Sequence, residues 1–131
     1  MHMSIKLLVS VFFACIVTPP VLAKDLCLGT FSNLQVNPEA GDLLGTEIHI
    51  VGTHAGKQAS VQFAEGEAGK LIVATIVCDG SHVSFKLPPD NGRAAATFNG
   101  QLSATRLTGE FVFDSGARDK VILVRRKSYW D

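Results

Sequence analysis

Residues 96–113 read ATFNGQLSATRLTGEFVF, and this stretch is the clearest indication of the fold class. Apolar and polar residues alternate with a period of two on both sides of a short polar break, which is typical of two antiparallel strands. Gly100 and Gly109 lie inside these strands. Glycine there marks a bend or a place where an aromatic ring lies over the backbone, and Phe98 or Phe111 can supply the ring. The stretch therefore predicts a curled β-sheet.

The same alternation continues in both directions along the chain, with Gly, Asn, Asp and Pro between the runs and no convincing helical period. Eight strands are expected at about 28–36, 43–51, 59–63, 71–77, 83–87, 96–102, 107–113 and 119–126. Short connections favour an eight-stranded antiparallel up-and-down (meander) barrel, because closure removes exposed sheet edges. The fold class is therefore all-β.

Three local features refine this prediction. Residues 71–77 are apolar on both faces except at Thr75, so this strand is expected to be the most enclosed one or to lie under a loop. Asp79-Gly80 predicts a tight hairpin turn. In strand 43–51, the even-numbered residues from Leu44 to Ile50 are expected inside and Glu47 outside.

The N-terminus indicates export. Lys6 is followed by the apolar run 7–17, and residues 21–23 form a small-residue cleavage site. This run is shorter than the roughly 20 residues that span a bilayer. We therefore expect a secretory signal peptide over 1–23 and a single secreted, periplasmic domain over 24–131.

Two of the three cysteines remain after such cleavage. Cys27 and Cys78 form an even pair in an oxidising compartment, which predicts one disulfide. Two reactive thiols are the alternative. Cys15 lies in the signal, and lipid anchoring there is disfavoured because the preceding Phe12, Phe13 and Ala14 lack the usual aliphatic start.

Charge and motifs restrict the function further. Without Lys6 the chain has eleven Lys or Arg (12 − 1) against twelve Asp or Glu, so no imbalance indicates nucleic acid or a membrane. No nucleophile elbow or cofactor motif is present, and we expect no enzyme and no cofactor. Glu65 and Glu67 are expected to be solvated charges rather than a catalytic pair.

The histidines and the C-terminus have plain structural interpretations. His49, His54 and His82 have spacings that fit no helical or finger-type zinc site, so they are expected at the surface and no metal site is predicted. Residues 125–131 combine three basic residues with two aromatic ones. We expect this tail to fold back and cap one end of the barrel, burying Trp130. Binding to a partner is the alternative.

Two short motifs at opposite ends of the domain resemble a known pattern. Gly29-Thr30-Phe31 opens the first strand, and Arg125 or Arg126 ends the last. This resembles the calycin pattern of lipocalins and fatty-acid-binding proteins, in which a Gly-x-Trp packs under an arginine from the final strand. Phe31 replaces the Trp. The resemblance implies a lipocalin-like small secreted bacterial barrel.

A second, local resemblance lies near the C-terminus. Ser115-Gly116-Ala117-Arg118 is similar to the Ser-Gly-x-Lys/Arg-Tyr loop of the periplasmic inhibitors of c-type lysozyme, although Asp119 stands where that family has Tyr. The resemblance implies that Ser115 and Arg118 contact a protein partner. A simple Ser-Gly turn between two strands is the alternative.

These observations favour an exported, non-catalytic binding protein with an eight-stranded interior, which is just wide enough to be filled by side chains or to hold one small ligand. Five phenylalanines on the inward faces favour a filled or narrow interior. The expected ligand-lining residues are Ile48, Ile50, Phe63, Phe85, Phe98 and Phe111. The alternative is a protein-binding inhibitor of a lysozyme-like hydrolase that acts through a loop at a barrel end.

Overall fold

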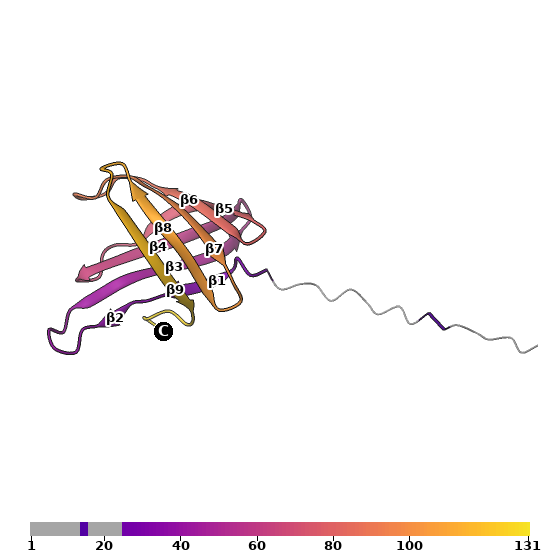
Figure 1. Ribbon diagram of the computed structural model, residues 1–131, viewed down its shortest axis with the longest axis horizontal. Coiled ribbons are helices and arrows are strands. Elements are labelled where there is room, and N and C mark those ends of the chain that lie inside the picture. The colour runs from indigo at the N-terminus through magenta and orange to yellow at the C-terminus, as the bar shows by residue number, and fades with distance from the viewer. Residues whose placement is uncertain (1–13, 16–24) are drawn as a thin grey trace, which may run out of the picture.

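The computed structural model describes residues 14–15 and 25–131 (Figure 1). The predicted signal peptide, 1–23, lies outside the described residues apart from 14 and 15. The strands are β1 Gly29–Ser32, β2 Gln35–Val36, β3 Leu43–Thr53, β4 Gly56–Gly66, β5 Ile72–Asp79, β6 His82–Leu87, β7 Ala96–Leu102, β8 Arg106–Phe113 and β9 Arg118–Arg125.

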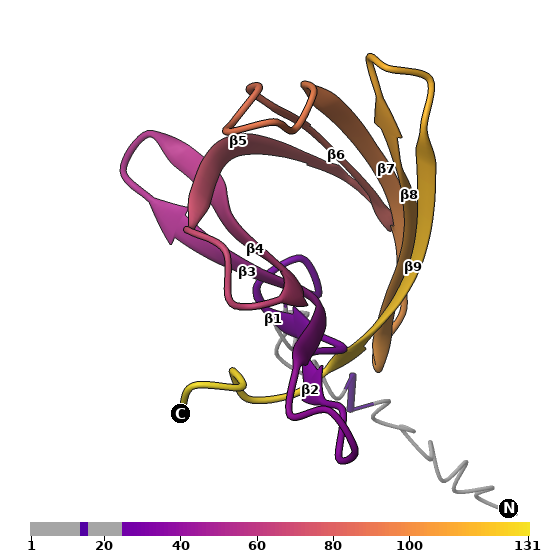
Figure 2. The same cartoon turned by 90° about the vertical axis from the view of Figure 1, so that its left-hand side faces the viewer.

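The strands form a closed antiparallel meander (Figures 1 and 2). From β3 to β9 each strand pairs with the next, and β1 closes the wall by pairing with both β3 and β9. At the closure, Phe31 is opposite Ile48 on one side and Arg125 on the other. The eight-stranded barrel is confirmed, since β1 and β2 are two parts of the strand predicted at 28–36.

The break between β1 and β2 lies where the backbone of Asn33 comes close to β3. Asn33 exchanges hydrogen bonds with Thr46: its amide donates to the Thr46 carbonyl at 3.1 Å, and its side-chain oxygen accepts from the Thr46 amide at 2.7 Å. A side chain at Gly45 would lie 2.7 Å from the Asn33 carbonyl oxygen, and Gly45 has a φ of 122°. Only glycine satisfies both conditions, so the strand breaks where Asn33 approaches β3.

One apolar core fills the barrel, and the prediction for its glycines is confirmed. A Cβ atom at Gly100 would lie 2.8 Å from the ring of Phe98, and one at Gly109 would lie 2.5 Å from it. Phe98 is fully buried and packs over both glycines. The missing side chains therefore make the space that this ring occupies.

Two predictions about β5 and its turn are wrong in detail. Asp79 pairs with His82, so the two-residue turn is Gly80-Ser81, and Gly80 alone has a positive φ, of 58°. The inward residues of β5 are buried, but Val73 and Val77 on its outer face are 62% and 61% exposed. This strand is not enclosed on both faces, because no described segment covers its outer side.

Alternation also fails near the start of β3. Leu44 was expected inside but is 42% exposed, whereas Glu47, on the outer face, is only 7% exposed. The chain after β9 causes the burial: it crosses the outside of β1 and reaches β3 and β4 (Figure 2). The predicted cap is therefore wrong, since the tail lies on the barrel wall and Trp130 remains 57% exposed.

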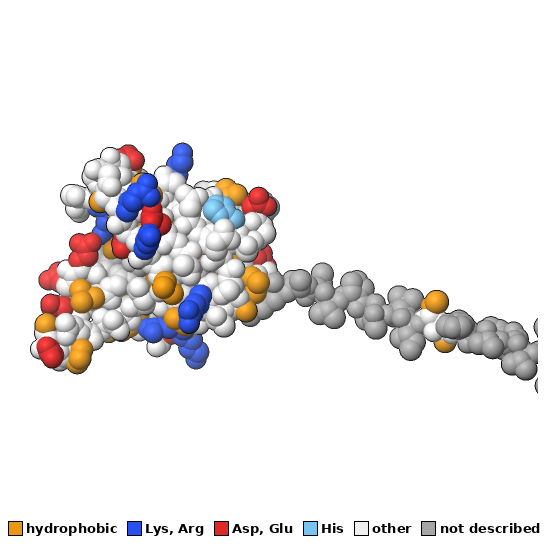
Figure 3. All heavy atoms as spheres, in the orientation of Figure 1, with side chains coloured by type: hydrophobic (Ala, Val, Ile, Leu, Met, Phe, Trp, Pro, Cys, Tyr) orange, Lys and Arg blue, Asp and Glu red, His pale blue; other side chains and the backbone are white. Residues whose placement is uncertain are grey.

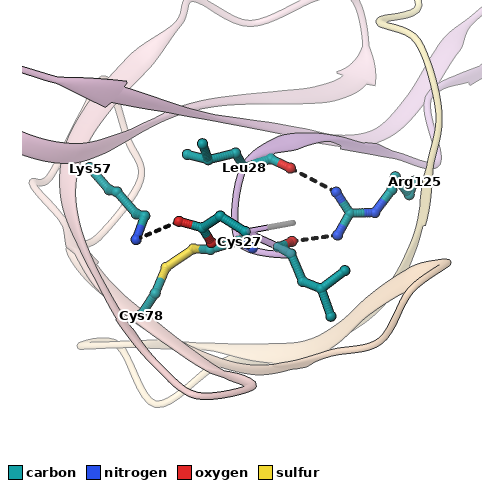
Figure 4. The surroundings of a disulfide bond; sticks show 7 residues. Cys27, Leu28, Lys57, Cys78 and Arg125 are labelled. Atoms are coloured by element: carbon teal, nitrogen blue, oxygen red, sulfur yellow. Dashed lines mark hydrogen bonds and ion pairs between the residues drawn. A yellow bond between two sulfur atoms is a disulfide. The ribbon is translucent and has the colours of Figure 1, made fainter. Parts of the chain in front are cut away.

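The N-terminal segment closes one end of the barrel (Figure 4). The predicted Cys27–Cys78 disulfide is present, with 6.5 Å between the Cα atoms. Cys27 is 2% exposed and belongs to the core. The disulfide therefore fixes the segment before β1 to the end of β5.

Arg125 fixes the same segment from the opposite wall. Its Nη1 donates to the Leu28 carbonyl at 2.7 Å, and its Nη2 donates to the Leu26 carbonyl. The guanidinium lies 4.5 Å from the centre of the Phe31 ring, and a side chain at Gly29 would meet it at 2.8 Å. The residues that resemble the calycin pattern are thus in contact.

Candidate binding site at the open end

The end opposite the disulfide is formed by four loops, at residues 37–42, 67–71, 88–95 and 114–117. In Figure 3 acidic side chains gather on this side of the molecule, which is the left side of the view. Lys70 and Asp90 join two of the loops by an ion pair of 2.8 Å. These loops surround the mouth of the barrel.

All six residues predicted to line a ligand point into the barrel and are buried in one core. Ile48 and Ile50 are 0% and 1% exposed, and the four phenylalanines are between 0% and 6% exposed. The structure thus brings these residues together. Of the six, Phe63 reaches the open end, where it borders a hollow.

The aromatic rings of the core contact one another in series. Phe98 stacks on Phe85 with 4.8 Å between ring centres and lies 4.7 Å from Phe111. Phe111 in turn contacts Phe63 at 5.1 Å and Phe113 at 6.3 Å. These contacts form a packed column of rings from the barrel centre to its mouth, so the floor of the open end is aromatic.

A hollow of about 550 Å³ lies above this floor. Its lining residues are Asp42, Phe63, Glu65, Gly66, Glu67, Ala68, Gly69 and Arg93. The Arg93 guanidinium lies 4.0 Å from the centre of the Phe63 ring. The positive charge of Arg93 therefore lies over the Phe63 ring, and the carboxylates of Asp42, Glu65 and Glu67 border the same hollow.

A second hollow of about 340 Å³ shares Glu65 and Arg93 with the first and also borders Phe113 and Ser115. The two hollows are therefore neighbouring parts of one recessed mouth. Phe63 and Phe113 are the aromatic members of a lining that is otherwise mostly polar and carries both signs of charge. Such a site can hold the apolar part of a small molecule while leaving a polar part in water.

The structure separates the two residues predicted to contact a protein partner. Ser115 is exposed in the turn between β8 and β9, where its hydroxyl accepts a hydrogen bond from the Ala117 amide at 3.4 Å. Arg118 lies on the outer wall, where its Nη1 donates to Glu110 at 2.7 Å. Arg118 is therefore already engaged by a carboxylate of its own chain.

The histidines lie on the surface or the outer wall, in agreement with the prediction. His49 shares a hydrogen bond with Thr30, and the ring nitrogens of His82 bond Asn99 and Gln101, each at 3.2 Å. His54 is exposed in the turn between β3 and β4. In residues 14–15 and 25–131 no group of three or more potential ligands is placed to hold a metal ion.

The closed end carries one perturbed carboxyl group. Lys57 donates to Asp25 at 2.9 Å, and the Cys27 amide donates to the same carboxylate at 3.0 Å. The bond from Lys57 and then the one from Cys27 lower the pKa of Asp25 below its ordinary value of 3.8. The charged form is thus favoured where it holds the N-terminal segment.

Arg93 and Phe113 belong to the mouth but were not predicted from the sequence as site residues. Phe113 was predicted to face the interior. Its position at the end of β8 could have indicated that its ring reaches the mouth. Arg93 gave no signal, because it lies in an irregular loop and its position over Phe63 depends on how that loop folds.

Comparison of the chain with protein-family models, with curated proteins and with solved structures finds no match. Within the part of the chain that the structure describes, no helix has the length and apolar character to cross a membrane.

Proposed function

We propose that this chain is an exported, non-catalytic, lipocalin-like protein that binds the apolar part of a small molecule in the mouth of its barrel. The observation that supports this best is the recessed mouth, with Phe63 as its floor and Arg93 lying 4.0 Å above that ring. The other end is occupied by the disulfide-linked segment, so a ligand would enter at the mouth.

Two further observations support parts of this proposal. The contact of Arg125 with Phe31 has the arrangement of the calycin pattern, which favours a lipocalin-like barrel. The buried Cys27–Cys78 bond fits an oxidising compartment, as expected for an exported chain. Because the column of rings fills the barrel below the mouth, the ligand is expected to bind near the surface.

The test uses a neutral fluorescent apolar probe, N-phenyl-1-naphthylamine, titrated into the purified domain. We expect saturable enhancement with the native sequence and at least about tenfold weaker binding when Ala68→Phe or Ala117→Phe fills a hollow, equivalent to ~1.4 kcal/mol. Ala104→Phe, in the exposed turn at the closed end, is the matched control and should bind normally. Equal binding by all variants would place the probe elsewhere and refute the proposal.

A second candidate function, inhibition of a lysozyme-like hydrolase, is supported by the exposed position of Ser115 at the open end. Arg118 would have to leave Glu110 to enter a cleft. The test is inhibition of a panel of lysozymes by the native domain and by the Ser115→Ala, Arg118→Ala double variant. No inhibition by the native domain, or equal inhibition by both, would remove this function.

A further inference from the structure

A second recess lies on the outer wall of the barrel, away from the mouth. Its volume is about 270 Å³, and it is lined by Glu47, His49, Ser60, Gln62, Leu71, Ser128, Trp130 and Asp131. Strands β3 and β4 form its base, since Glu47 pairs with Gln62 and His49 pairs with Ser60. The C-terminal tail forms one side.

The tail is held firmly on the wall. The Ser128 hydroxyl and the Tyr129 amide both donate to the buried Glu47 carboxylate, the latter at 2.9 Å. The Arg126 side chain donates to the Leu34 carbonyl at 3.1 Å, and Tyr129 packs against the small cluster that contains Leu34. A buried carboxylate that accepts two such bonds is a strong anchor.

Trp130 is fixed in orientation and yet open to solvent. Its indole nitrogen donates to the Gln62 side chain at 2.7 Å, and the Gln62 amide nitrogen donates to the Gly69 carbonyl at 2.7 Å. Tyr129 contacts the indole edge-on, with 5.0 Å between ring centres. Even so, Trp130 is 57% exposed, beside Leu71 at 61%. A ring serving only to cover the wall would be buried, so this geometry fits a preformed contact surface.

The lining of the recess distinguishes between kinds of ligand. An exposed indole and Leu71 offer apolar contact. Ser60 can donate and accept hydrogen bonds, the ring nitrogen of His49 that does not bond Thr30 can do one or the other, and Asp131 can accept them. The carboxylates of Glu47 and Asp131 disfavour inorganic anions. A purely apolar molecule would leave the polar side chains of the recess without hydrogen-bond partners. A sugar ring has one face of C–H groups and a rim of hydroxyls that donate and accept, which matches this combination.

We propose that this outer-wall recess binds one pyranose ring of a saccharide, with its C–H face on Trp130 and its hydroxyls toward Ser60, His49 and Asp131. The volume is slightly below the roughly 300 Å³ at which sites for drug-sized ligands begin, so it suits a single ring. The recess and the mouth share no lining residue.

The chain provides its own reporter, because Trp130 is its only tryptophan. The domain is titrated separately with glucose, galactose, mannose and N-acetylglucosamine, and tryptophan fluorescence and backbone amide NMR shifts are recorded. We expect at least one sugar to give saturable changes in both signals with a Kd of about 1 mM, which is ~4 kcal/mol of binding. The amide shifts should cluster at residues 47–49, 60–62, 71 and 128–131.

Three variants and one control complete the test. Trp130→Ala should abolish the amide shifts, and Ser60→Phe should do so by filling the recess while leaving every residue of the tail unchanged. His49→Ala should weaken binding about tenfold, whereas His82→Ala, an outward histidine on β6, should have no effect. If no sugar shifts these amides, if the variants bind as well as the native domain, or if choline shifts the same amides and sugars do not, the proposal is wrong.

Discussion

A methyl group added at Gly109 is expected to destabilise the barrel strongly. The new Cβ atom would lie 2.5 Å from Cζ of Phe98 and 2.6 Å from the carbonyl oxygen of Asn99. Real Cβ atoms do not approach other atoms so closely, so the ring or the strand must move. The ring has little freedom, because Phe98 is fully buried between Phe85 and Phe111.

The size of the effect follows from overpacking. Forcing an extra methyl group into a well-packed core costs about 1–3 kcal/mol, and Gly109→Ala should lie at the upper end because backbone blocks one direction and an enclosed ring the other. For a domain of this size, a loss of ~3 kcal/mol corresponds to a fall in Tm of roughly 12 °C or more.

The assay is equilibrium urea unfolding followed by circular dichroism, with the disulfide intact. Gly52→Ala in β3 is the matched control, since no atom lies within 4 Å of its added Cβ and its φ is not positive. That variant should keep the native stability or gain up to about 1 kcal/mol through the unfolded chain. If Gly109→Ala is as stable as Gly52→Ala, Phe98 does not pack over β8 and the account of the core is wrong.

Three further outcomes are expected. Replacing Cys27 and Cys78 by serine should lower the free energy of unfolding by about 4 kcal/mol, the value of the chain-entropy model for a loop of 52 residues counting both ends. Thermal unfolding measures this loss. A loss below about 1 kcal/mol would show that other contacts mainly hold the N-terminal segment. Glu47→Gln should weaken the anchor of the tail and increase the mobility of Trp130, seen as lower fluorescence anisotropy and faster proteolysis of the tail; an unchanged tail would contradict the anchoring role. Because the folded-state pKa of Asp25 is lowered, its stabilising effect is present above the ordinary pKa of 3.8, which applies to the unfolded chain, and is lost as pH falls through the lower folded value. The urea midpoint of the native domain should therefore fall toward that of Asp25→Asn below about pH 4. The fall should be small because the Asp25–Lys57 ion pair is exposed to solvent. A difference between the two midpoints that stays constant down to about pH 2 would contradict this.

The barrel was predictable because its evidence is local. A period of two assigns each residue of a strand to one face, and this placed the six predicted interior residues correctly. Gly100 and Gly109 indicated that a ring lies over the backbone, and Phe98 is that ring. The even number of cysteines after Cys15 indicated the disulfide.

The candidate sites were much less predictable, because they depend on segments that meet only in the folded chain. Arg93 belongs to the mouth because the loop between β6 and β7 brings it over Phe63, which lies on β4. The recess on the outer wall exists because the tail returns to a strand about 80 residues earlier, where Ser128 and Tyr129 meet Glu47. Alternation correctly placed Glu47 on the outer face but gave no sign that the tail buries it there, and the prediction that the tail caps a barrel end and buries Trp130 was wrong.

The amino-acid sequence alone is enough to predict a meander of short strands, most of the residues that face its interior, and the position of one covalent link. These features follow from the alternating geometry of the strand and from the chemistry of glycine and cysteine, which act at each position separately. The closed end, the recessed end with Phe63 in its lining, and the second recess beside the tail become visible in the folded chain and not before. Each of these three features depends on contacts between segments far apart in the sequence. Whether a side chain is buried there depends on which distant segment packs against it.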